Sequence, residues 1–363
     1  APLARSTPTL WAYAQRNAHK DTPKKINPAS NLFLYILLLI IDLAEKTMRK
    51  SIILLCLYVV SLKSILSQTT TPNKVQVVTK LVQKSIPIQN NQNLQFETKR
   101  AKLLLSPSTD NQIHIKISLI AKHTSKQKAE KDLQALTYQI IENQGTITLK
   151  NDIQRDKVNE RVTSLLKTIY EVQVPSSVTV GIKQKYGEIE IEKINSNLNI
   201  DCNYTDIKLA QLHAEKVDIQ TNYSDIVAKN CSGKFTLIGS YNKVKIYQAH
   251  KMHLTGTFNY SEILIEDFSG EANINANYSE IEMSDIKETQ RMNIISNYSD
   301  IEFKDVQNLA HFGFDIAGNF SDIDIAEPLK KDFVRTMNRI VKNAAQGSPV
   351  IKITANYGDI EIE

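Results

Sequence analysis

The same short phrase occurs eight times between Tyr186 and Tyr357: an aromatic residue, a hydroxyl residue or glycine, a carboxylate and then an aliphatic residue. A degenerate copy, YNKVKI at Tyr241, fills the one gap. The aromatic residues fall at 186, 204, 223, 241, 260, 278, 298, 320 and 357, so the first seven intervals are 18 to 22 residues. A period this constant predicts a stack of similar supersecondary units.

Apolar residues keep the same period as the phrase. They lie six and four positions before each aromatic residue, and three and five positions after it; around Tyr278 they are Ala272, Ile274, Ile281 and Met283. Polar residues separate them, which is the pattern of a strand with one buried face and one solvated face. Each unit is therefore predicted to contain two short strands with a polar corner between them.

An all-β fold follows for residues 181–363, and two arrangements fit the pattern. One is a parallel β-helix, or β-solenoid, with coils of about 19 residues, in which each coil pairs with the coils above and below it. The other is an antiparallel meander with one hairpin per repeat. We favour the solenoid, because a closed coil has a fixed perimeter and tolerates only small changes in repeat length.

The interval from Phe320 to Tyr357 is longer because it contains an insertion at residues 328–349. Its KKDFVRTMNRIVKNAAQG segment predicts a short basic helix that ends at Gly347. Such a helix would protrude at a corner of the solenoid, in a position to cap the last coil.

The formal charge of +5 belongs to the start of the chain. Residues 1–67 contain nine Lys or Arg and three Asp or Glu, a net of +6, which leaves 35 basic and 36 acidic residues, a net of −1, in residues 68–363. The repeats therefore carry no basic excess of the kind that marks nucleic-acid-binding proteins.

Residues 48–67 have the pattern of a secretory signal peptide. Basic Arg49 and Lys50 precede an apolar run of about a dozen residues, and the small Ser67 stands before an expected new N-terminus at Gln68. Export to the periplasm, the outer surface or the medium is expected, with membrane attachment only if this leader stays uncleaved. Residues 1–47, which contain a shorter apolar run at residues 32–41, are interpreted as an upstream extension of doubtful status, either a translated upstream region or an overlong gene model, with a genuine membrane anchor as the alternative.

Residues 68–180 are expected to form an irregular β segment with one short helix. Apolar and polar residues alternate as in strands in LQFET, KLLLS, QIHIKISLIAK and TITLKN. The segment TSKQKAEKDLQALTYQII is typical of a helix that runs into a strand.

The order of these elements, followed by IYEVQV-Pro and the Tyr-Gly/Ser-Asp/Glu-Ile coils, resembles the bacterial putative-adhesin family of β-strand-repeat proteins found in Bacteroidota. The resemblance covers about residues 90–363 and implies an exported, non-catalytic β-solenoid, with adhesion suggested by analogy.

The candidate binding surface is the row of repeat corners. It is formed by the aromatic residue and the carboxylate of each phrase: Tyr204, Asp206, Tyr223, Asp225, Tyr260, Glu262, Tyr278, Glu280, Tyr298 and Asp300. A column of stacked carboxylates invites comparison with Ca²⁺ sites, but calcium-binding β-rolls supply several oxygen ligands per turn and these corners supply one. We expect the carboxylates to bond nearby backbone N–H groups. The tyrosines and the asparagines before them are expected to form ladders.

Other chemistry-bearing residues predict structural roles. His250 and His253 are spaced as HxxH without a completing ligand, and residues three apart on a strand face opposite sides. Cys202 and Cys231 could form one disulfide after export, but they occupy different positions in adjacent coils, so buried free thiols are expected. No recognisable nucleophile, base and orienting group converge, so the sequence predicts no catalytic, metal or cofactor site.

The leading functional hypothesis is an exported adhesin-like or envelope-associated protein that binds a glycan or protein ligand on its surface. The main alternative is a glycan-binding or polysaccharide-cleaving protein, since parallel β-helices also carry such enzymes. A third is a regulatory protein of the cell envelope. A cleft with clustered acidic or metal-binding groups would favour the enzyme.

Overall fold

A computed structural model describes residues 74–89, 92–154, 161–305, 311–327, 329–344 and 348–363. The expected upstream extension, at residues 1–47, and the expected signal peptide, at residues 48–67, lie outside these residues. Within the described part of the chain, no helix is both long and apolar enough to cross a bilayer.

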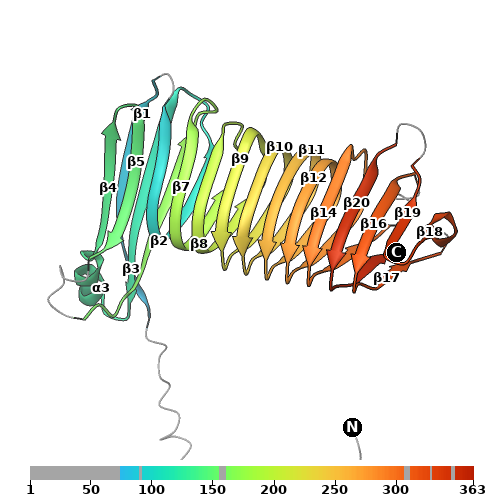
Figure 1. The fold of residues 1–363 in the computed structure, drawn as a ribbon. Coiled ribbons are helices and arrows are strands. Elements are labelled where there is room, and N and C mark those ends of the chain that lie inside the picture. Colours follow the sequence, from blue (N-terminus) through green and yellow to red (C-terminus); the bar gives the residue numbers. More distant parts are fainter. Residues whose placement is uncertain (1–73, 90–91, 155–160, 306–310, 328, 345–347) are drawn as a thin grey trace, which may run out of the picture. The chain divides into compact units, whose positions relative to one another are not determined.

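The repeats form a parallel β-solenoid, as the sequence predicts (Figure 1). Over residues 179–303, each strand pairs in parallel with the equivalent strand one repeat later, so that Leu237, Gly256 and Ile274 lie side by side in three successive coils. An antiparallel meander is excluded by this register. The first strands of the stack are β7 (Thr179–Ile191), β8 (Leu198–Leu209), β9 (Leu212–Asn222), β10 (Asp225–Ser240), β11 (Lys243–Asn259) and β12 (Glu262–Asn277).

Two corners give each coil two facing strand segments. The first corner is the aromatic residue, whose φ is between 51° and 63° in every copy. The second lies seven residues later, where Asn230, Gln248, Asp267, Asp285 and Asp305 also have positive φ. Between the corners, side chains alternate: Ile281 and Met283 are fully buried, while Glu280 is exposed. The predicted inward positions therefore form the core.

The chain before the solenoid closes one end of the stack. The first coil is β2, which pairs in parallel with β7 on one side and with β5 and β6 on the other. β3 pairs antiparallel with both β6 and β1, and β4 forms a hairpin with β5. The expected helix before a strand is present as α3. The bounds are β1 (Gln76–Pro87), β2 (Asn93–Pro107), β3 (Gln112–His123), α3 (Lys126–Leu133), β4 (Leu136–Asn143), β5 (Thr146–Ile153) and β6 (Leu165–Val174).

Charged side chains lie where the outer strands β1 and β4 meet. Lys84 Nζ donates to Glu142 Oε1 (2.5 Å), and Lys80 Nζ lies 5.9 Å from the centre of the Tyr138 ring. Lysine at an edge strand hinders pairing with another chain. These contacts therefore join β1 to β4, and they also hinder the pairing of these outer strands with another chain.

At the other end the coils do not stack in sequence order. β20 lies between β14 and β16, with Ile353 beside both Ile294 and Ile316, and β21 lies between β15 and β17. The last strands of the chain thus insert into the stack, and the coil of Phe320 becomes the outermost (Figure 1). The bounds are β13 (Glu280–Ile286), β14 (Arg291–Asn297), β15 (Asp300–Phe303), β16 (Gly313–Asn319), β17 (Ile323–Ile325), β20 (Val350–Asn356) and β21 (Ile360–Ile362).

The prediction of a basic helix in the insertion is wrong. The insertion forms a short 3₁₀ turn, η2 (Leu329–Asp332), and a hairpin of β18 (Val334–Arg335) and β19 (Arg339–Lys342). β19 pairs antiparallel with β16, and Arg339 makes two 2.7 Å hydrogen bonds to the carboxylate of Asp315. The exposed edge of β16 gains a partner in this way, which outweighs the helical propensity of the segment. The predicted helix end at Gly347 lies outside the described residues.

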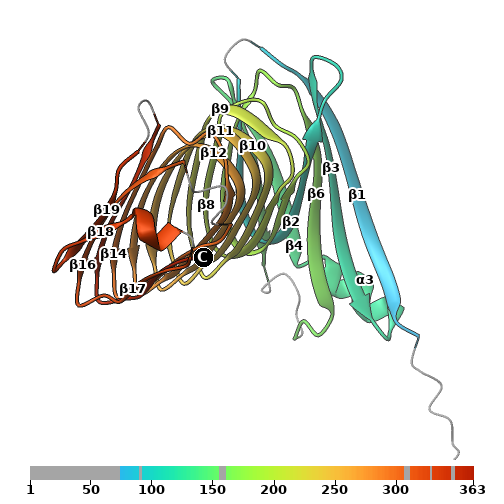
Figure 2. The ribbon, with the colours of Figure 1, turned by 90° about the vertical axis from the view of Figure 1, so that its right-hand side faces the viewer.

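The insertion nevertheless caps the terminal coil, as its position in the sequence suggests. Leu329 is buried, and the ring of Phe333 lies 5.5 Å from that of Phe314. η2 and the hairpin thus cover the apolar interior at this end of the stack (Figure 2).

Candidate functional site

Nine aromatic rings form one continuous ladder along the first corner. Neighbouring ring centres are 4.8 to 5.1 Å apart, and the planes of neighbouring rings differ by 1° to 16°. The predicted stacking in register is confirmed, although the ladder follows the stacking order of the coils. That order is Tyr186, Tyr204, Tyr223, Tyr241, Tyr260, Tyr278, Tyr298, Tyr357 and Phe320.

Each ladder tyrosine is about half exposed, between 41% and 50%. Because the ring faces cover one another, the ring edges and hydroxyl groups are what solvent meets. Among the described residues, none hydrogen-bonds to these hydroxyl groups. Arg100, which also has positive φ, covers the face of Tyr186 at one end, whereas Phe320 is 83% exposed at the other.

The left-handed backbone of this corner suits glycine better than tyrosine. The conformation costs a non-glycine residue about 1 kcal/mol, while an aromatic pair contributes about 0.5–1.5 kcal/mol. We therefore expect both Tyr278→Ala and Tyr278→Gly to reduce the free energy of unfolding, with alanine worse than glycine by about 1 kcal/mol. Urea unfolding of the two variants checks this. Equal stability, or a more stable alanine variant, would contradict the argument.

A second ladder runs beside the rings and consists of the asparagine that precedes seven of the nine aromatic residues; Lys185 and Ser240 precede the other two. In five neighbouring pairs, Nδ2 of one asparagine donates to Oδ1 of the next at 2.9 or 3.0 Å. The expected asparagine ladder is thereby confirmed. The bonded pairs, donor first, are Asn222–Asn203, Asn277–Asn259, Asn297–Asn277, Asn356–Asn297 and Asn319–Asn356.

The serine that follows Tyr223, Tyr260, Tyr278 and Tyr298 has a role that the sequence did not reveal. Its side chain points inward, and it accepts from the backbone N–H of the equivalent residue in the preceding coil: Ser261 N donates to Ser279 Oγ (3.1 Å) and Ser279 N to Ser299 Oγ (3.0 Å). Asn242 replaces serine in the degenerate copy and accepts from Ser224 N (3.0 Å). This ladder satisfies buried backbone groups, which explains why the phrase needs a hydroxyl there.

The carboxylates therefore do not have the backbone-bonding role expected of them. Within the described part of the chain, the one such bond among the candidate carboxylates is from Asp359 N to Asp300 Oδ1 (3.0 Å). Asp225, Glu262, Glu280 and Asp300 do share one column, but Lys243 lies in it and bonds to Glu262. That hydrogen bond raises the pKa of Lys243. The column is thus a row of single, solvated carboxylates with an interleaved lysine.

A groove of about 540 Å³ lies between the two ladders in the second half of the solenoid. Its walls are the rings and amides of four consecutive coils in the stack. They belong to Asn259, Tyr260, Asn277, Tyr278, Asn297, Tyr298, Asn356 and Tyr357. All eight side chains are uncharged, so the groove offers only aromatic edges, hydroxyl groups and amides.

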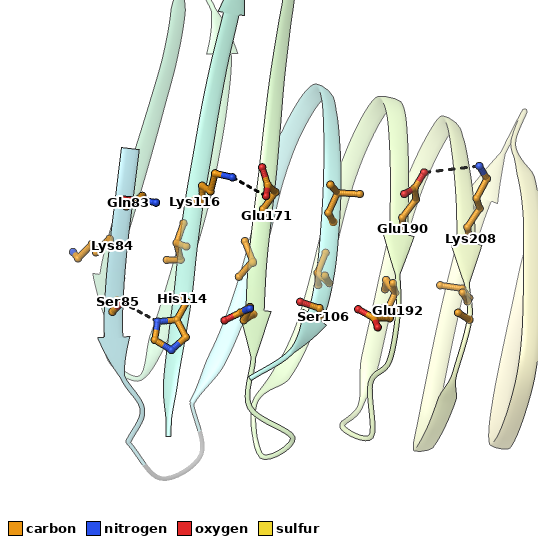
Figure 3. Close-up of a pocket in the computed structure, with 18 of the residues that line it drawn as sticks. Gln83, Lys84, Ser85, Ser106, His114, Lys116, Glu171, Glu190, Glu192 and Lys208 are labelled. Atoms are coloured by element: carbon orange, nitrogen blue, oxygen red, sulfur yellow. Dashed lines mark hydrogen bonds and ion pairs between the residues drawn. The ribbon is translucent and has the colours of Figure 1, made fainter. Parts of the chain in front are cut away.

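A larger hollow of about 1100 Å³ lies over β1, β3, β6, β2, β7 and β8 (Figure 3). At its edge, Ser85 Oγ lies 2.8 Å from His114 Nδ1, and His114 Nε2 lies 2.9 Å from Asp110 Oδ1. The expectation that no nucleophile, base and orienting group converge is therefore wrong. Ser85 and His114 meet because the antiparallel register of β1 and β3 places them opposite each other, and no sequence motif marks that pairing.

Other contacts suggest that this trio belongs to the structure of a turn. Asp110 also accepts from Ser108 Oγ (2.9 Å) and from the backbone of Gln112 (3.1 Å), and these bonds, with His114, lower its pKa. Ser85 and Asp110 are both exposed to solvent. An exposed serine on a regular strand lacks the sharp turn that presents a nucleophile in hydrolases.

The two histidines of the HxxH spacing each lie beside a carboxylate of the next coil. His250 Nε2 is 3.6 Å from Asp267, and His253 Nδ1 is 3.4 Å from Glu271. Residues three apart on a regular strand face opposite sides, but the side chains of His250 and His253 are both exposed. The reason is that the backbone leaves the regular strand conformation at Gln248 and Lys251, where φ is positive. Their partners are single carboxylates on separate residues, which is a surface ion-pair arrangement.

Cys202 and Cys231 are buried free thiols, as predicted. Burial raises the pKa of Cys231 to about 12 and also raises that of Cys202. Both cysteines therefore serve as small core residues and not as nucleophiles.

The family model described as Toastrack DUF4097 matches residues 91–363. No curated protein matches the chain. Solved structures that are similar include a "putative adhesin from Parabacteroides distasonis", with 10% identity over 78% of this chain and 97% of that one and a TM-score of 0.45. A "putative cell adhesion protein from Clostridium sporogenes" has 9% identity over 78% and 99%, with a TM-score of 0.24. A "putative lipid binding protein" from P. distasonis has 12% identity over 78% and 97%, with a TM-score of 0.36.

Proposed function

Because the chain belongs to the Toastrack DUF4097 family, we propose that it is an exported, non-catalytic β-solenoid that binds a ligand at the cell envelope in the manner of an adhesin. The resemblance inferred from the repeats is confirmed by the family match, which leaves the ligand open. Export is supported by the signal-peptide pattern of residues 48–67.

The observation that carries the proposal is the pair of ladders on the first corner. Tyrosine hydroxyl groups that face solvent and partly exposed asparagine amides recur together along most of the coils, and the backbone register holds them in place. A rigid, periodic surface of this kind binds without paying for the ordering of flexible loops. The carboxylates that an enzyme would have to cluster are instead spread one per coil.

The second candidate function is hydrolysis of envelope or host glycans or esters. The hydrogen-bonded Ser85, His114 and Asp110 beside the large hollow favour it. The same residues also define the control that separates the two functions, since a Ser85→Ala variant loses the only hydroxyl that His114 contacts among the described residues.

We expect the purified full-length protein to show no turnover of neutral or anionic polysaccharides, or of a simple nitrophenyl ester. Ca²⁺ or Zn²⁺ should not change this result. The assay measures reducing ends, unsaturated ends and released nitrophenol, with Ser85→Ala as the matched control. Turnover that disappears in Ser85→Ala or His114→Ala would establish an enzyme and end the non-catalytic proposal.

Binding is tested separately with an array of envelope glycans, host glycans and matrix proteins. The proposed function predicts saturable binding to at least one of them by the full-length protein. Cells that lack the protein should adhere less to a surface coated with that ligand. If the protein binds nothing on the array and its loss leaves adhesion unchanged, the adhesin-like function is wrong.

A further inference from the structure

We propose that the groove between the tyrosine and asparagine ladders binds a neutral, linear polysaccharide in an extended conformation, parallel to the axis along which the coils stack. The proposal rests on the proposed binding function and assigns it a site and a ligand class. The site consists of the four coils whose aromatic residues are Tyr260, Tyr278, Tyr298 and Tyr357.

The chemistry of the groove matches a polymer rich in hydroxyl groups. Each tyrosine contributes a hydroxyl group that can both donate and accept and that no described residue occupies. Each asparagine Nδ2 has two hydrogens. The ladder uses one of them in Asn277, Asn297 and Asn356, which leaves at least one donor per coil of the groove. The groove therefore presents one hydroxyl group and one free amide hydrogen at every step.

The spacing of these groups favours a polysaccharide over a peptide. Neighbouring rings of the groove are 4.8 or 4.9 Å apart, which is close to the advance of one sugar residue in an extended β-linked glycan. A peptide strand advances about 3.3 Å per residue and repeats a face about every 6.6 Å, so its side chains would fall out of step with the coils. An extended β-1,4-linked glycan turns neighbouring sugars over, so it can repeat the same contacts at every second coil.

The charge and the shape of the groove argue against an anionic polymer and against a second copy of the chain as its occupant. The eight side chains that line the groove are neutral, and exposed Glu262, Glu280 and Asp300 lie two positions past three of its tyrosines. An anionic polymer would be repelled by these carboxylates. The corner of a second copy would present the same hollow, and two hollows that face each other leave a gap between them.

The stacked rings also determine how the sugar is bound. Their faces cover one another, so the polysaccharide contacts ring edges and hydroxyl groups. Each contact is then weak, and affinity comes from repetition along the chain. Phe320, which is 83% exposed at the end of the ladder, is the ring best placed to stack on a terminal sugar.

The test is isothermal titration of the full-length protein with β-1,4-linked gluco-, manno- and xylo-oligosaccharides of increasing length. At least one series should bind, with an affinity that rises with length up to about the number of coils in the groove and that changes little with added salt. The triple variant Tyr260→Phe, Tyr278→Phe and Tyr298→Phe keeps the ring stack but removes three hydroxyl groups. It should weaken binding at least tenfold, whereas Tyr138→Phe, away from the groove, should not.

Several outcomes would overturn this assignment. They are the absence of binding to all three series, affinity that does not depend on length, tighter binding of an anionic polysaccharide, and unchanged affinity in the triple variant. A change in oligomeric state in the triple variant, measured by analytical ultracentrifugation, would instead identify a second copy as the occupant. If the wild-type protein still binds another array ligand, only the groove assignment fails; if it binds nothing, the proposed function fails too.

Discussion

Ile281→Asp should lower the free energy of unfolding by an amount on the order of 4 kcal/mol, because it buries a charge that has no partner. The side chain of Ile281 is fully buried and faces the interior between the two sheets of a central coil. It lies beside Ile263 and Ile301 in the neighbouring coils. A repeat protein shares its core between nearest neighbours, so the lesion disrupts three coils at once.

The matched control is Glu280→Gln, one residue earlier on the exposed side of the same strand. It should change the stability by less than about 0.5 kcal/mol, as expected of a surface substitution. Denaturant unfolding of both variants measures the difference. A larger loss in Glu280→Gln than in Ile281→Asp would mean that the inward and outward faces have been assigned the wrong way round.

Removal of residues 350–363 should unfold the whole capped end of the solenoid. β20 and β21 connect β14 and β15 to β16 and β17, and no other described strand fills that position. The truncation removes four fully buried isoleucines, which stabilise the fold by roughly 1.5–3 kcal/mol each. They are Ile351, Ile353, Ile360 and Ile362.

Amide hydrogen exchange provides the measurement for this truncation. Protection of β16 and β19 should fall by more than about a thousandfold, since each 1.4 kcal/mol corresponds to a factor of ten. Amides in β7 to β11 should keep their protection, because each coil depends on its neighbours. Lys352→Thr, on the exposed side of β20, is the control and should leave exchange unchanged. Persistent protection of β16 in the truncated protein would contradict the inserted position of β20.

The stacked corner is the part of the candidate site that the sequence predicted. A fixed period places the same residue at the same point of every coil, so the tyrosines and asparagines had to form columns once the strands were parallel. The inward alternation of Ile281 and Met283 followed from the period of two. The role of the serines was missed, because a buried hydroxyl that accepts a hydrogen bond from the preceding coil has the same sequence pattern as a turn residue.

The repeat itself determined the solenoid, its register and the ladders on its corner, because these depend on contacts that every coil makes with any neighbour. Those contacts are nearly the same for all coils, so they do not encode which coil lies next to which. Only the tertiary structure decided that Tyr357 stacks between Tyr298 and Phe320, that the insertion forms an edge hairpin, and that Ser85 meets His114. In each case the deciding interaction joins segments far apart in the sequence, at an end of the stack where the repeat pattern no longer applies.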